Sequence, residues 1–358
     1  MGGAVRLLES GGGGALRPAV SVVVPVYNAA SRLSACVESL LGQTLGECEF
    51  IFVNDGSSDG SGSILDAYQS RDPRVRVIHQ ENRGVSEARN AGIQACSGFY
   101  IGFVDADDTV EADMFEQLYR TAAAESCDVV ICNYESETGA HKQITRYPFP
   151  SGRVLLREEL DREILPYYIS DEDCNSVCNK LFLRSMIEKH SLRFPQGVDL
   201  GEDGIFNVRF LLKAERAFYL DYTGYHYLDN PGSATRNIAG KDYFRKALER
   251  FEAPLPEGFE ARVGGTDIRR LRSVRFIRTA ASLVHMYMEP ARDMSLRRRM
   301  AYLRKMLNHP GLRTAFPDYY KEEYPSLDTY QRAVIDAMSR RRLGRLYLLT
   351  AYSRIRNR

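Results

Sequence analysis

The sequence predicts an α/β fold in which a mostly parallel β-sheet is flanked by helices. Its first half alternates apolar, β-branched runs with segments that repeat apolar residues at helical spacing. The apolar runs have no polar face, as expected of strands that are buried on both sides of a parallel sheet. Right-handed crossovers join such strands, and because the strands are parallel their carboxyl ends meet at one edge, where ligands bind in such sheets.

The first two strand–helix units are read directly from this alternation. Residues 20–26 form a β-branched run, and the next apolar positions, from Leu33 to Leu41, repeat at the spacing of a core-facing helix. A second strand at residues 50–53 stops at the turn-rich segment 54–60, which leads into another helix. The third unit has a short strand at 75–78 and a helix with small residues that would let it lie close to the sheet.

The fourth strand, residues 100–104, ends abruptly in three carboxylates, Asp105, Asp107 and Asp108. Alternate side chains of an extended backbone share a side, so Asp105 and Asp107 can face one bound ion. Such a pair suits a hard divalent cation that is shared with phosphate. The alternative is a solvated acidic loop in which Asp107 or Asp108 caps the next element. A helix at 114–124 and a fifth strand at 129–132 follow. Residues 139–147 are expected to be a loop, and a helical stretch is expected from about Val154 to Ile169.

Composition limits the classes of function. Lys and Arg total 48 against 47 for Asp and Glu, so no overall charge favours nucleic acid as a partner. The seven cysteines have no paired CxxC spacing, and we expect buried thiols of a reducing compartment rather than a metal site. No apolar run approaches the roughly 20 residues needed to cross a bilayer. We therefore expect a cytoplasmic protein, or one attached by its surface to the inner face of the plasma membrane.

Polar residues at four strand ends predict a single crevice. Tyr27 and Asn28, Asp55, Arg83 or Arg89, and the Asp105 segment each follow a different strand. The chain has no Gly-x-Gly-x-x-Gly after its first strand and no P-loop signature, which argues against a dinucleotide or P-loop site.

Four ordered motifs at these strand ends resemble family 2 glycosyltransferases. They read Val-Val-Pro-Val-Tyr-Asn, Val-Asn-Asp-Gly-Ser-Ser-Asp, Asn-Arg-Gly-Val-Ser-Glu-Ala-Arg-Asn-Ala-Gly and Phe-Val-Asp-Ala-Asp-Asp. The resemblance covers residues 20–132 and continues more loosely to about Asn237. It implies the GT-A fold, inversion at the anomeric carbon, a nucleotide-diphosphate sugar donor and Mg²⁺ or Mn²⁺. The implied acceptor is a hydroxyl of a cell-surface polysaccharide, a teichoic-type polymer or a glycolipid.

The resemblance also implies roles for the residues at the strand ends. Pro25, Tyr27 and Asn28 would line the nucleotide pocket, and Asp55 would read the base. A carboxylate can accept the N3–H of uracil, which favours a UDP-sugar, although Asp55 could instead be a turn-forming Asx residue.

The remaining donor-side roles belong to the next two motifs. Arg89, with Arg83 as a neighbour, would lie near the diphosphate, although either could be a solvated helix charge. Asp105 and Ala106 would contact donor hydroxyls, and Asp107 would bind the metal ion that bridges the phosphates.

The second half contains one informative stretch, residues 201–207, which opens a helix. It resembles the family motif whose aspartate is the catalytic base, so Asp203 is the expected base and Glu202 a supporting residue. Acidic residues favoured by the dipole at a helix start would explain the same pair. Lys180 is expected either to reach a phosphate or acceptor or to be structural.

Two further candidates follow in the chain. His226 is either a third metal ligand, as in some relatives, or an ordinary edge histidine. Arg236, in a segment read as a mobile closing loop, could clamp the diphosphate.

The resemblance fades after about Lys241, where long helical patterns dominate. Residues 340–358 contain no acidic side chain, and leucines and tyrosines interleave with arginines. This segment is either a membrane-surface helix that approaches a lipid-linked acceptor or a packed helix with a solvated face.

The expected organisation has three parts. Residues 1–18 form a disordered leader, 19–237 the catalytic domain and 238–358 a helical C-terminal region. Within the catalytic domain, 19–133 is the nucleotide-sugar-binding half and 134–237 the acceptor half. The sequence thus predicts a metal-dependent inverting glycosyltransferase. The non-enzymatic alternative is an inert module of the same fold that binds sugar or protein.

Overall fold

The computed structural model of the chain divides into two units, each with its own core. It describes residues 17–138, 141–171, 173–198, 201–229, 242–264, 267–289 and 294–356. The first unit comprises residues up to 165 together with 173–230, and the second comprises 166–172 together with the chain from 231 onward. We call them the N-terminal and C-terminal units. The predicted boundary at 237 lies outside the described residues, so the predicted domain limits stay a prediction.

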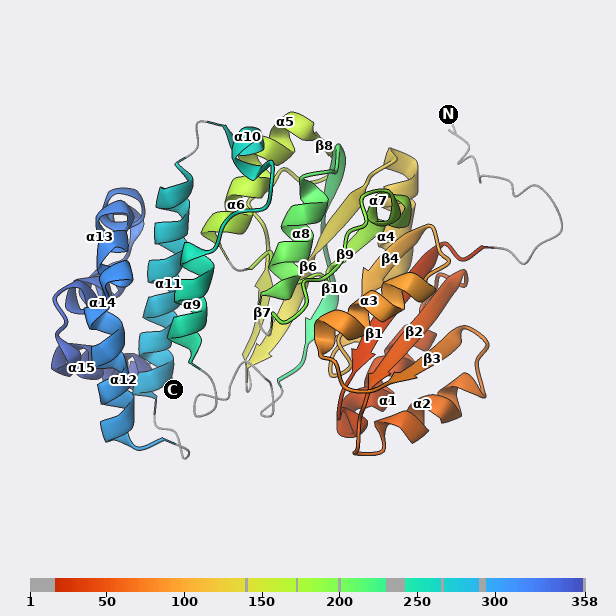
Figure 1. Cartoon of the computed structure of the whole chain (residues 1–358), viewed down its shortest axis with the longest axis horizontal. Helices are drawn as coiled ribbons and strands as arrows, with labels where there is room; N and C mark the ends of the chain where they lie inside the picture. Colours follow the sequence, from red (N-terminus) through yellow and green to blue (C-terminus); the bar gives the residue numbers. More distant parts are fainter. Residues whose placement is uncertain are drawn as a thin grey trace. The chain divides into compact units, whose positions relative to one another are not determined.

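The N-terminal unit is built on one sheet of ten strands within the described residues (Figure 1). Its main path runs β3-β2-β1-β4-β9-β6-β10-β5, with β7 added beside β6 and β8 beside β10. The strands are β1 (Val20–Val26), β2 (Cys48–Asp55), β3 (Val75–Gln80), β4 (Tyr100–Phe103), β5 (Thr109–Val110), β6 (Val129–Thr138), β7 (His141–Thr145), β8 (Val154–Leu156), β9 (Lys180–Leu183) and β10 (Arg216–Tyr227). Neighbours in β3-β2-β1-β4 are parallel, as are β6 and β10. The predicted α/β class with a mostly parallel sheet is confirmed.

Helices join the strands of this unit. They are α1 (Ala30–Leu41), α2 (Ser61–Gln69), α3 (Val85–Ala95), α4 (Met114–Glu125), α5 (Arg157–Glu159), the π-helical turn η1 (Leu160–Ile164), α7 (Arg184–Lys189) and α8 (Glu202–Leu211); α6 (Leu165–Ser170) lies at the division between the units. Helix α3 packs on β1 and β2. A Cβ added at Gly92 would lie 2.3 Å from Cγ1 of Val23 on β1, so glycine allows this close approach.

Three local expectations need correction. Part of the expected loop at 139–147 is strand β7, which pairs with the end of β6. The sequence did not predict this strand, because a polar strand at a sheet edge lacks the apolar pattern of a buried one. The segment from Val154, expected to be helical, begins with β8, which pairs with β10. Asp108 does not cap a helix. It accepts hydrogen bonds from the Tyr225 hydroxyl at 2.7 Å and the Leu228 amide at 3.0 Å, which fixes the end of β10.

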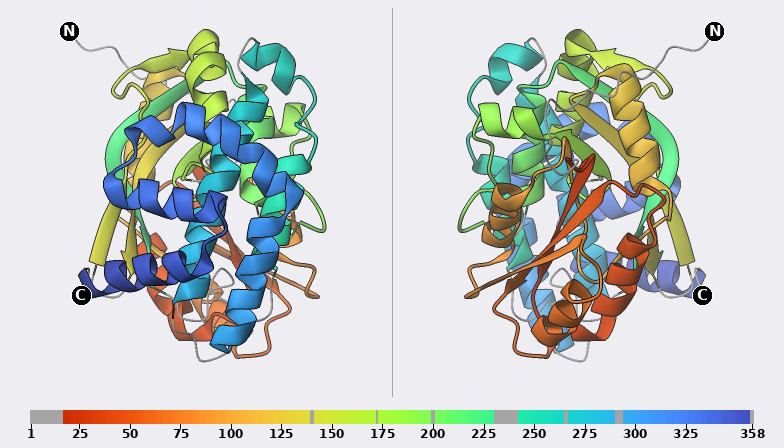
Figure 2. Two further views of the ribbon diagram at one scale, coloured as in Figure 1. Left: turned by 90° about the vertical axis from the view of Figure 1, so that its left-hand side faces the viewer. Right: turned by 90° about the vertical axis from the view of Figure 1, so that its right-hand side faces the viewer.

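The described residues of the C-terminal unit are helical (Figure 2). The elements are α9 (Tyr243–Glu252), α10 (Phe259–Val263), α11 (Ile268–Met288), α12 (Leu296–Asn308), α13 (Pro310–Glu322), the 3₁₀ turn η2 (Tyr324–Ser326), α14 (Thr329–Ser339) and α15 (Leu343–Arg356). The long helix α11 contacts α9, α12, α13, α14 and α15 and supplies buried side chains such as Phe276, Ile277 and Val284. Within the described ranges, none of the helices has both the length and the apolar character required to span a membrane.

Candidate active site

The loops that follow β1 and β2 are tied to each other by short hydrogen bonds. The Asn28 amide donates to Ser57 Oγ at 3.0 Å, and the Ser58 amide donates to Asn28 Oδ1 at 2.8 Å. Asn28 adopts a left-handed conformation, with φ of 50°, which asparagine tolerates better than most residues. These bonds leave the Tyr27 side chain 56% exposed at the end of β1. An exposed aromatic ring is therefore held at the predicted edge of the sheet.

Asp55, at the end of β2, organises the segment that follows β3. Its Oδ1 accepts hydrogen bonds from Gln80 Nε2 at 2.7 Å and the Arg83 amide at 2.9 Å, and its Oδ2 accepts from the Gly84 amide at 2.8 Å. The local turn bond is made instead by Asn54, whose Oδ1 accepts from the Ser57 amide at 3.1 Å. Asp55 is thus a buried carboxylate that fixes a distant loop, and the Arg83 side chain of that loop is exposed.

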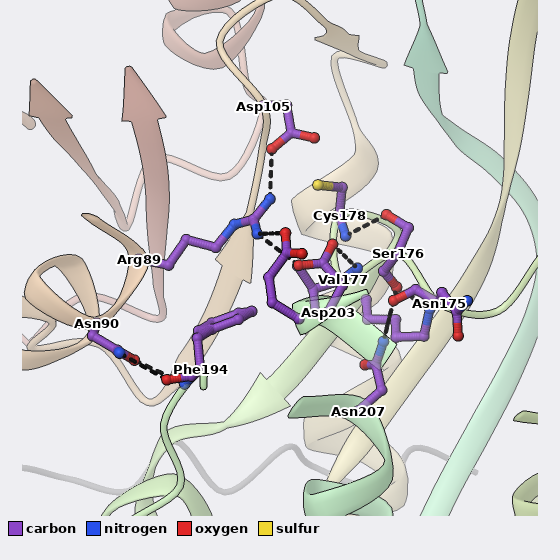
Figure 3. Close-up of polar contacts among 12 residues, drawn as sticks. Arg89, Asn90, Asp105, Asn175, Ser176, Val177, Cys178, Phe194, Asp203 and Asn207 are labelled. Atoms are coloured by element: carbon purple, nitrogen blue, oxygen red, sulfur yellow. Dashed lines mark hydrogen bonds and ion pairs between the residues drawn. The ribbon is translucent and has the colours of Figure 1, made fainter. Parts of the chain in front are cut away.

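Arg89 joins the two acidic motifs of the sequence (Figure 3). Its side chain is 3% exposed, with Nη2 2.9 Å from Asp105 Oδ1. Nη1 lies 2.6 Å from Asp203 Oδ1 and 3.1 Å from Glu202 Oε1. We call Asp105, Glu202 and Asp203 the carboxylate cluster. Residues about a hundred positions apart in the chain thus share one buried cation.

An aromatic ring fixes the guanidinium from another side. The carbon Cζ of Arg89 lies 5.2 Å from the centre of the Phe194 ring, within the range of a cation–π contact. The neighbouring Asn90 holds Phe194 by a pair of hydrogen bonds, from Asn90 Nδ2 to the Phe194 carbonyl at 3.0 Å and from the Phe194 amide to Asn90 Oδ1 at 2.9 Å (Figure 3). The sequence interpretation missed Asn90 and Phe194. Asn90 could have been found from its position beside Arg89 in the third motif, whereas nothing in the sequence around Phe194 indicates a role at the site.

Helix α8 begins at the carboxylate cluster and is seated on residues 174–178. The Val177 amide donates to Asp203 Oδ2 at 3.4 Å, and Asn207 Nδ2, one turn further along α8, donates to the Asn175 carbonyl at 2.6 Å. Lys180 is buried, and its Nζ donates to the carbonyls of Ser176 at 2.6 Å and Cys174 at 3.1 Å. Burial lowers the pKa of Lys180. These contacts favour the structural interpretation of this lysine over a phosphate contact.

The surroundings of Asp203 make its carboxylate a stronger base than a solvated aspartate. Burial, together with the charges of Glu202 and Asp105, raises the pKa of Asp203 to about 7, although Arg89 and the Val177 amide oppose that rise. The side chain keeps 17% of its surface exposed. Arg89 itself stays protonated, because the carboxylates raise its pKa despite its burial. A general base works best when its pKa lies near the operating pH.

The loop after β4 concentrates carboxyl groups. Asp108 is 3% exposed, and burial followed by the charges of Asp105 and Asp107 raises its pKa to about 8. Ala106 between them is buried, and Asp107 is partly exposed. Among the residues that the structure describes, no three His, Cys, Asp or Glu side chains are grouped closely enough to hold a metal ion by themselves. The charged, oxygen-rich loop fits a divalent cation whose remaining ligands come from a phosphate-bearing substrate.

The other predicted residues lie in different settings. His226 on β10 has Nε2 2.8 Å from Glu111 Oε1 and Nδ1 3.4 Å from Glu135 Oε1, so both ring nitrogens face carboxylates. Pro25 lies in β1, paired with Val53 of β2. Arg236 falls outside the described residues. The roles of these three residues stay predictions. All seven cysteines are buried thiols, as expected.

Comparisons with known proteins decide the family. The family model described as Glycosyl transferase family 2 matches residues 21–191. The glycosyltransferase GlyG of Streptococcus pneumoniae is 34% identical over 266 residues, which cover 72% of this chain and 85% of GlyG. The chain belongs to glycosyltransferase family 2. The identification made from the four motifs is therefore confirmed. Most of the residues that match the family model lie in the N-terminal unit, and they include most strands of its sheet.

Two further relatives place this family 2 glycosyltransferase among sequences and folds. EpsJ of Bacillus subtilis is 39% identical over 218 residues, which cover 61% of this chain and 63% of EpsJ, so the chain spans somewhat less than two thirds of that relative. Residues 1–349 of S. aureus TarS, solved in complex with UDP-GlcNAc, share 16% identity at a TM-score of 0.58, covering 94% of this chain and 91% of that one. At that identity the likeness shows a shared GT-A fold.

Proposed function

We propose that this glycosyltransferase moves a sugar from a UDP-sugar to an acceptor hydroxyl with inversion, and that Asp203 is the catalytic base. The observation that carries the proposal is the Arg89 guanidinium, which holds Asp203 at 2.6 Å beside Asp105 at 2.9 Å. One buried cation thus joins the expected donor side of the site to the expected base.

The chemistry of inversion requires what Asp203 offers. The acceptor oxygen attacks the anomeric carbon, the bond from that carbon to the diphosphate breaks, and the hydroxyl proton passes to a carboxylate on the attacking side. Arg89 donates a hydrogen bond to Asp203 Oδ1 and the Val177 amide donates one to Oδ2, so both contacts orient the carboxylate. Its raised pKa supports proton uptake near neutral pH. Glu202, on the same Nη1 of Arg89, acts through Arg89 as a positioning residue.

The donor pocket is proposed at the ends of β1 and β2. The exposed Tyr27 ring can stack on a nucleobase, and Pro25 and the fixed loop at Asn28 would line the same pocket. Asp55 Oδ2 accepts a hydrogen bond from the Gly84 amide, and a carboxylate oxygen can accept a second one, here from the N3–H of uracil. This reading supports a UDP-sugar as donor.

A divalent cation, Mg²⁺ or Mn²⁺, fits the negative loop after β4. Asp107 would hold it, and the ion when bound would neutralise charge that develops on the leaving diphosphate. We further propose that Arg236 and His226 assist on the phosphate and metal sides. Asp105 and Ala106 would contact donor hydroxyls, and the acceptor would be a hydroxyl of a cell-surface polysaccharide, a teichoic-type polymer or a glycolipid. The buried thiols are compatible with a reducing, cytoplasmic setting at the inner face of the membrane.

A donor-turnover assay with a matched variant tests the proposal. Release of UDP from a panel of UDP-sugars with Mn²⁺, with water as the default acceptor, is compared for the native chain, Asp203→Asn and Asp66→Asn. The control Asp66 is an exposed carboxylate of the same unit. Asp203→Asn should lower turnover by about 10²- to 10⁴-fold, the usual contribution of a general base. UDP affinity measured by calorimetry should stay within about threefold, which is less than about 0.7 kcal/mol.

Two results would overturn the assignment. Loss of UDP binding in Asp203→Asn would place this residue on the donor side rather than at the base. Absence of metal-dependent UDP binding and of turnover with every UDP-sugar in the native chain would support the inert binding module instead.

A further inference from the structure

Helix α15 has apolar side chains on two opposite faces. Its inner face contributes Leu346, which is fully buried, and Thr350, which is 1% exposed. On the opposite face, Leu348, Tyr352 and Ile355 are 70%, 59% and 76% exposed. Their spacing of four and three residues places them on one side of the helix. A helix that merely packs on its unit would present polar residues to solvent there.

The charge around this apolar face has one sign. Residues 340–356 contain six arginines and no acidic residue. Five of these arginines are exposed: Arg340, Arg341, Arg342, Arg345 and Arg356. The sixth, Arg354, is partly buried and donates to the Met288 carbonyl at 3.1 Å. The outer face of α15 is therefore both apolar and strongly basic.

Helix α12 extends the same surface. It contains five basic residues and no acidic one, and its exposed side chains include Arg297, Arg298, Arg304 and Lys305. Leu296 at its start is 45% exposed. The two helices contact each other, and Arg341 Nη1, just before α15, donates to Asn308 Oδ1 at the end of α12 at 3.2 Å. We call the exposed residues of these two helices the basic–apolar surface.

We propose that the basic–apolar surface binds an anionic membrane surface. Arginines are attracted to the headgroups of an anionic bilayer, and aliphatic side chains that enter the acyl boundary add to this attraction, so the two kinds of residue act together. Charge alone would suit any polyanion, including nucleic acid or a phosphate-bearing polymer. The exposed Leu348 and Ile355 favour lipid over such a polyanion, because the acyl boundary of a bilayer removes apolar side chains from water and a soluble polyanion does not. This surface is independent of the site that holds Asp203, so either proposal can fail alone.

Vesicle flotation of the full chain tests the proposal. Vesicles of phosphatidylglycerol mixed equally with phosphatidylcholine are compared with vesicles of phosphatidylcholine alone. Two double variants remove one component each: Leu348→Gln with Ile355→Gln, and Arg345→Gln with Arg356→Gln. All four positions are exposed and glutamine is a good helix former, so the fold should persist. The matched control, Arg71→Gln with Arg120→Gln, removes two exposed arginines of the N-terminal unit.

The native chain and the control should float with anionic vesicles and not with neutral ones. Each double variant should lower the partition coefficient by about tenfold or more. Binding should weaken when salt rises from about 0.1 M to about 1 M, because the screening length falls from about 10 Å to about 3 Å. Failure of the native chain to float would overturn the proposal. So would full binding by the Leu348 and Ile355 variant, because it would show that charge alone suffices and that the apolar face does not contact lipid.

Discussion

Replacing Arg89 with methionine tests whether this guanidinium holds the site together. Methionine keeps a long apolar stem and removes the charge that contacts the carboxylate cluster. Arg89 is 3% exposed and its three ion pairs range from 2.6 to 3.1 Å. Removing one partner of such a buried network leaves charges uncompensated, which costs about 3–5 kcal/mol. We expect the free energy of unfolding in urea to fall by that amount.

The same variant should shift the pH dependence of turnover. Arg89 lowers the pKa of Asp203, whereas burial and the other carboxylates raise it to about 7. Removing Arg89 therefore raises this pKa further. A general base acts only when deprotonated, so the rising limb of UDP release against pH should move to higher pH. Each unit of displacement lowers activity about tenfold at a fixed pH below the limb.

The assay compares UDP release across the neutral range for the native chain, Arg89→Met, Arg89→Lys and Arg120→Met. Lysine keeps the charge but lacks the fork that binds two carboxylates at once, so its limb should move less. Arg120 is 75% exposed and pairs with Glu116 on α4, so Arg120→Met should cost less than about 1 kcal/mol and leave the limb in place. An unchanged limb in Arg89→Met, or a limb at lower pH, would refute the reasoning.

Three further changes have defined outcomes. Asp107→Ala should weaken Mn²⁺-dependent UDP binding, measured by calorimetry, about tenfold or more, which is about 1.4 kcal/mol. With a chelator present, the native chain and the variant should bind UDP alike. Equal affinity of the two for UDP in the presence of Mn²⁺ would contradict the metal role of Asp107. Gly92→Ala should cost about 1–3 kcal/mol in urea, because the new Cβ would lie 2.3 Å from a methyl of β1, whereas Gly46→Ala has open space and serves as its control. Lys180→Met should lower the free energy of unfolding in urea by about 1–3 kcal/mol, because it leaves buried carbonyls without a donor, whereas Lys189→Met at an exposed position should not. Unchanged stability together with lost UDP affinity would instead support a phosphate contact by Lys180.

The sequence predicted the parallel half of the sheet because its signal is local. The β-branched run of β1 and the apolar run of β2 are buried on both sides, so their composition alone identifies them. Strand β7 escaped prediction because it is polar and its partner is the edge of β6. Burial on both sides selects apolar residues and so makes β1 and β2 recognisable in the sequence. Strand pairing through the backbone selects no particular residue type, so β7 is not recognisable.

The candidate site divides in the same way. The Asp105 segment and the Glu202–Asp203 pair were both found from motifs, and each has a local reason to be acidic. That Arg89 would contact all three carboxylates could not be predicted, because it depends on where α8 is seated against α3. That seating rests on Phe194 and on residues 174–178, whose contacts involve backbone atoms and one aromatic ring. A sequence shows which side chains can donate or accept hydrogen bonds, but it does not show which backbone groups they will meet.

Asp55 has a consequence for engineering this enzyme. The Gly84 amide that it binds immediately precedes α3, and Arg89 lies five residues further on in the same helix. Five residues of helix span about 7.5 Å, a short and stiff link. A redesign of Asp55 for another nucleobase would therefore also disturb the start of the helix that carries Arg89. On the proposed roles of Asp55 and Arg89, donor selectivity and turnover are therefore linked. A library that varies residues 80–84 together with Asp55 should yield more active variants than one that varies Asp55 alone.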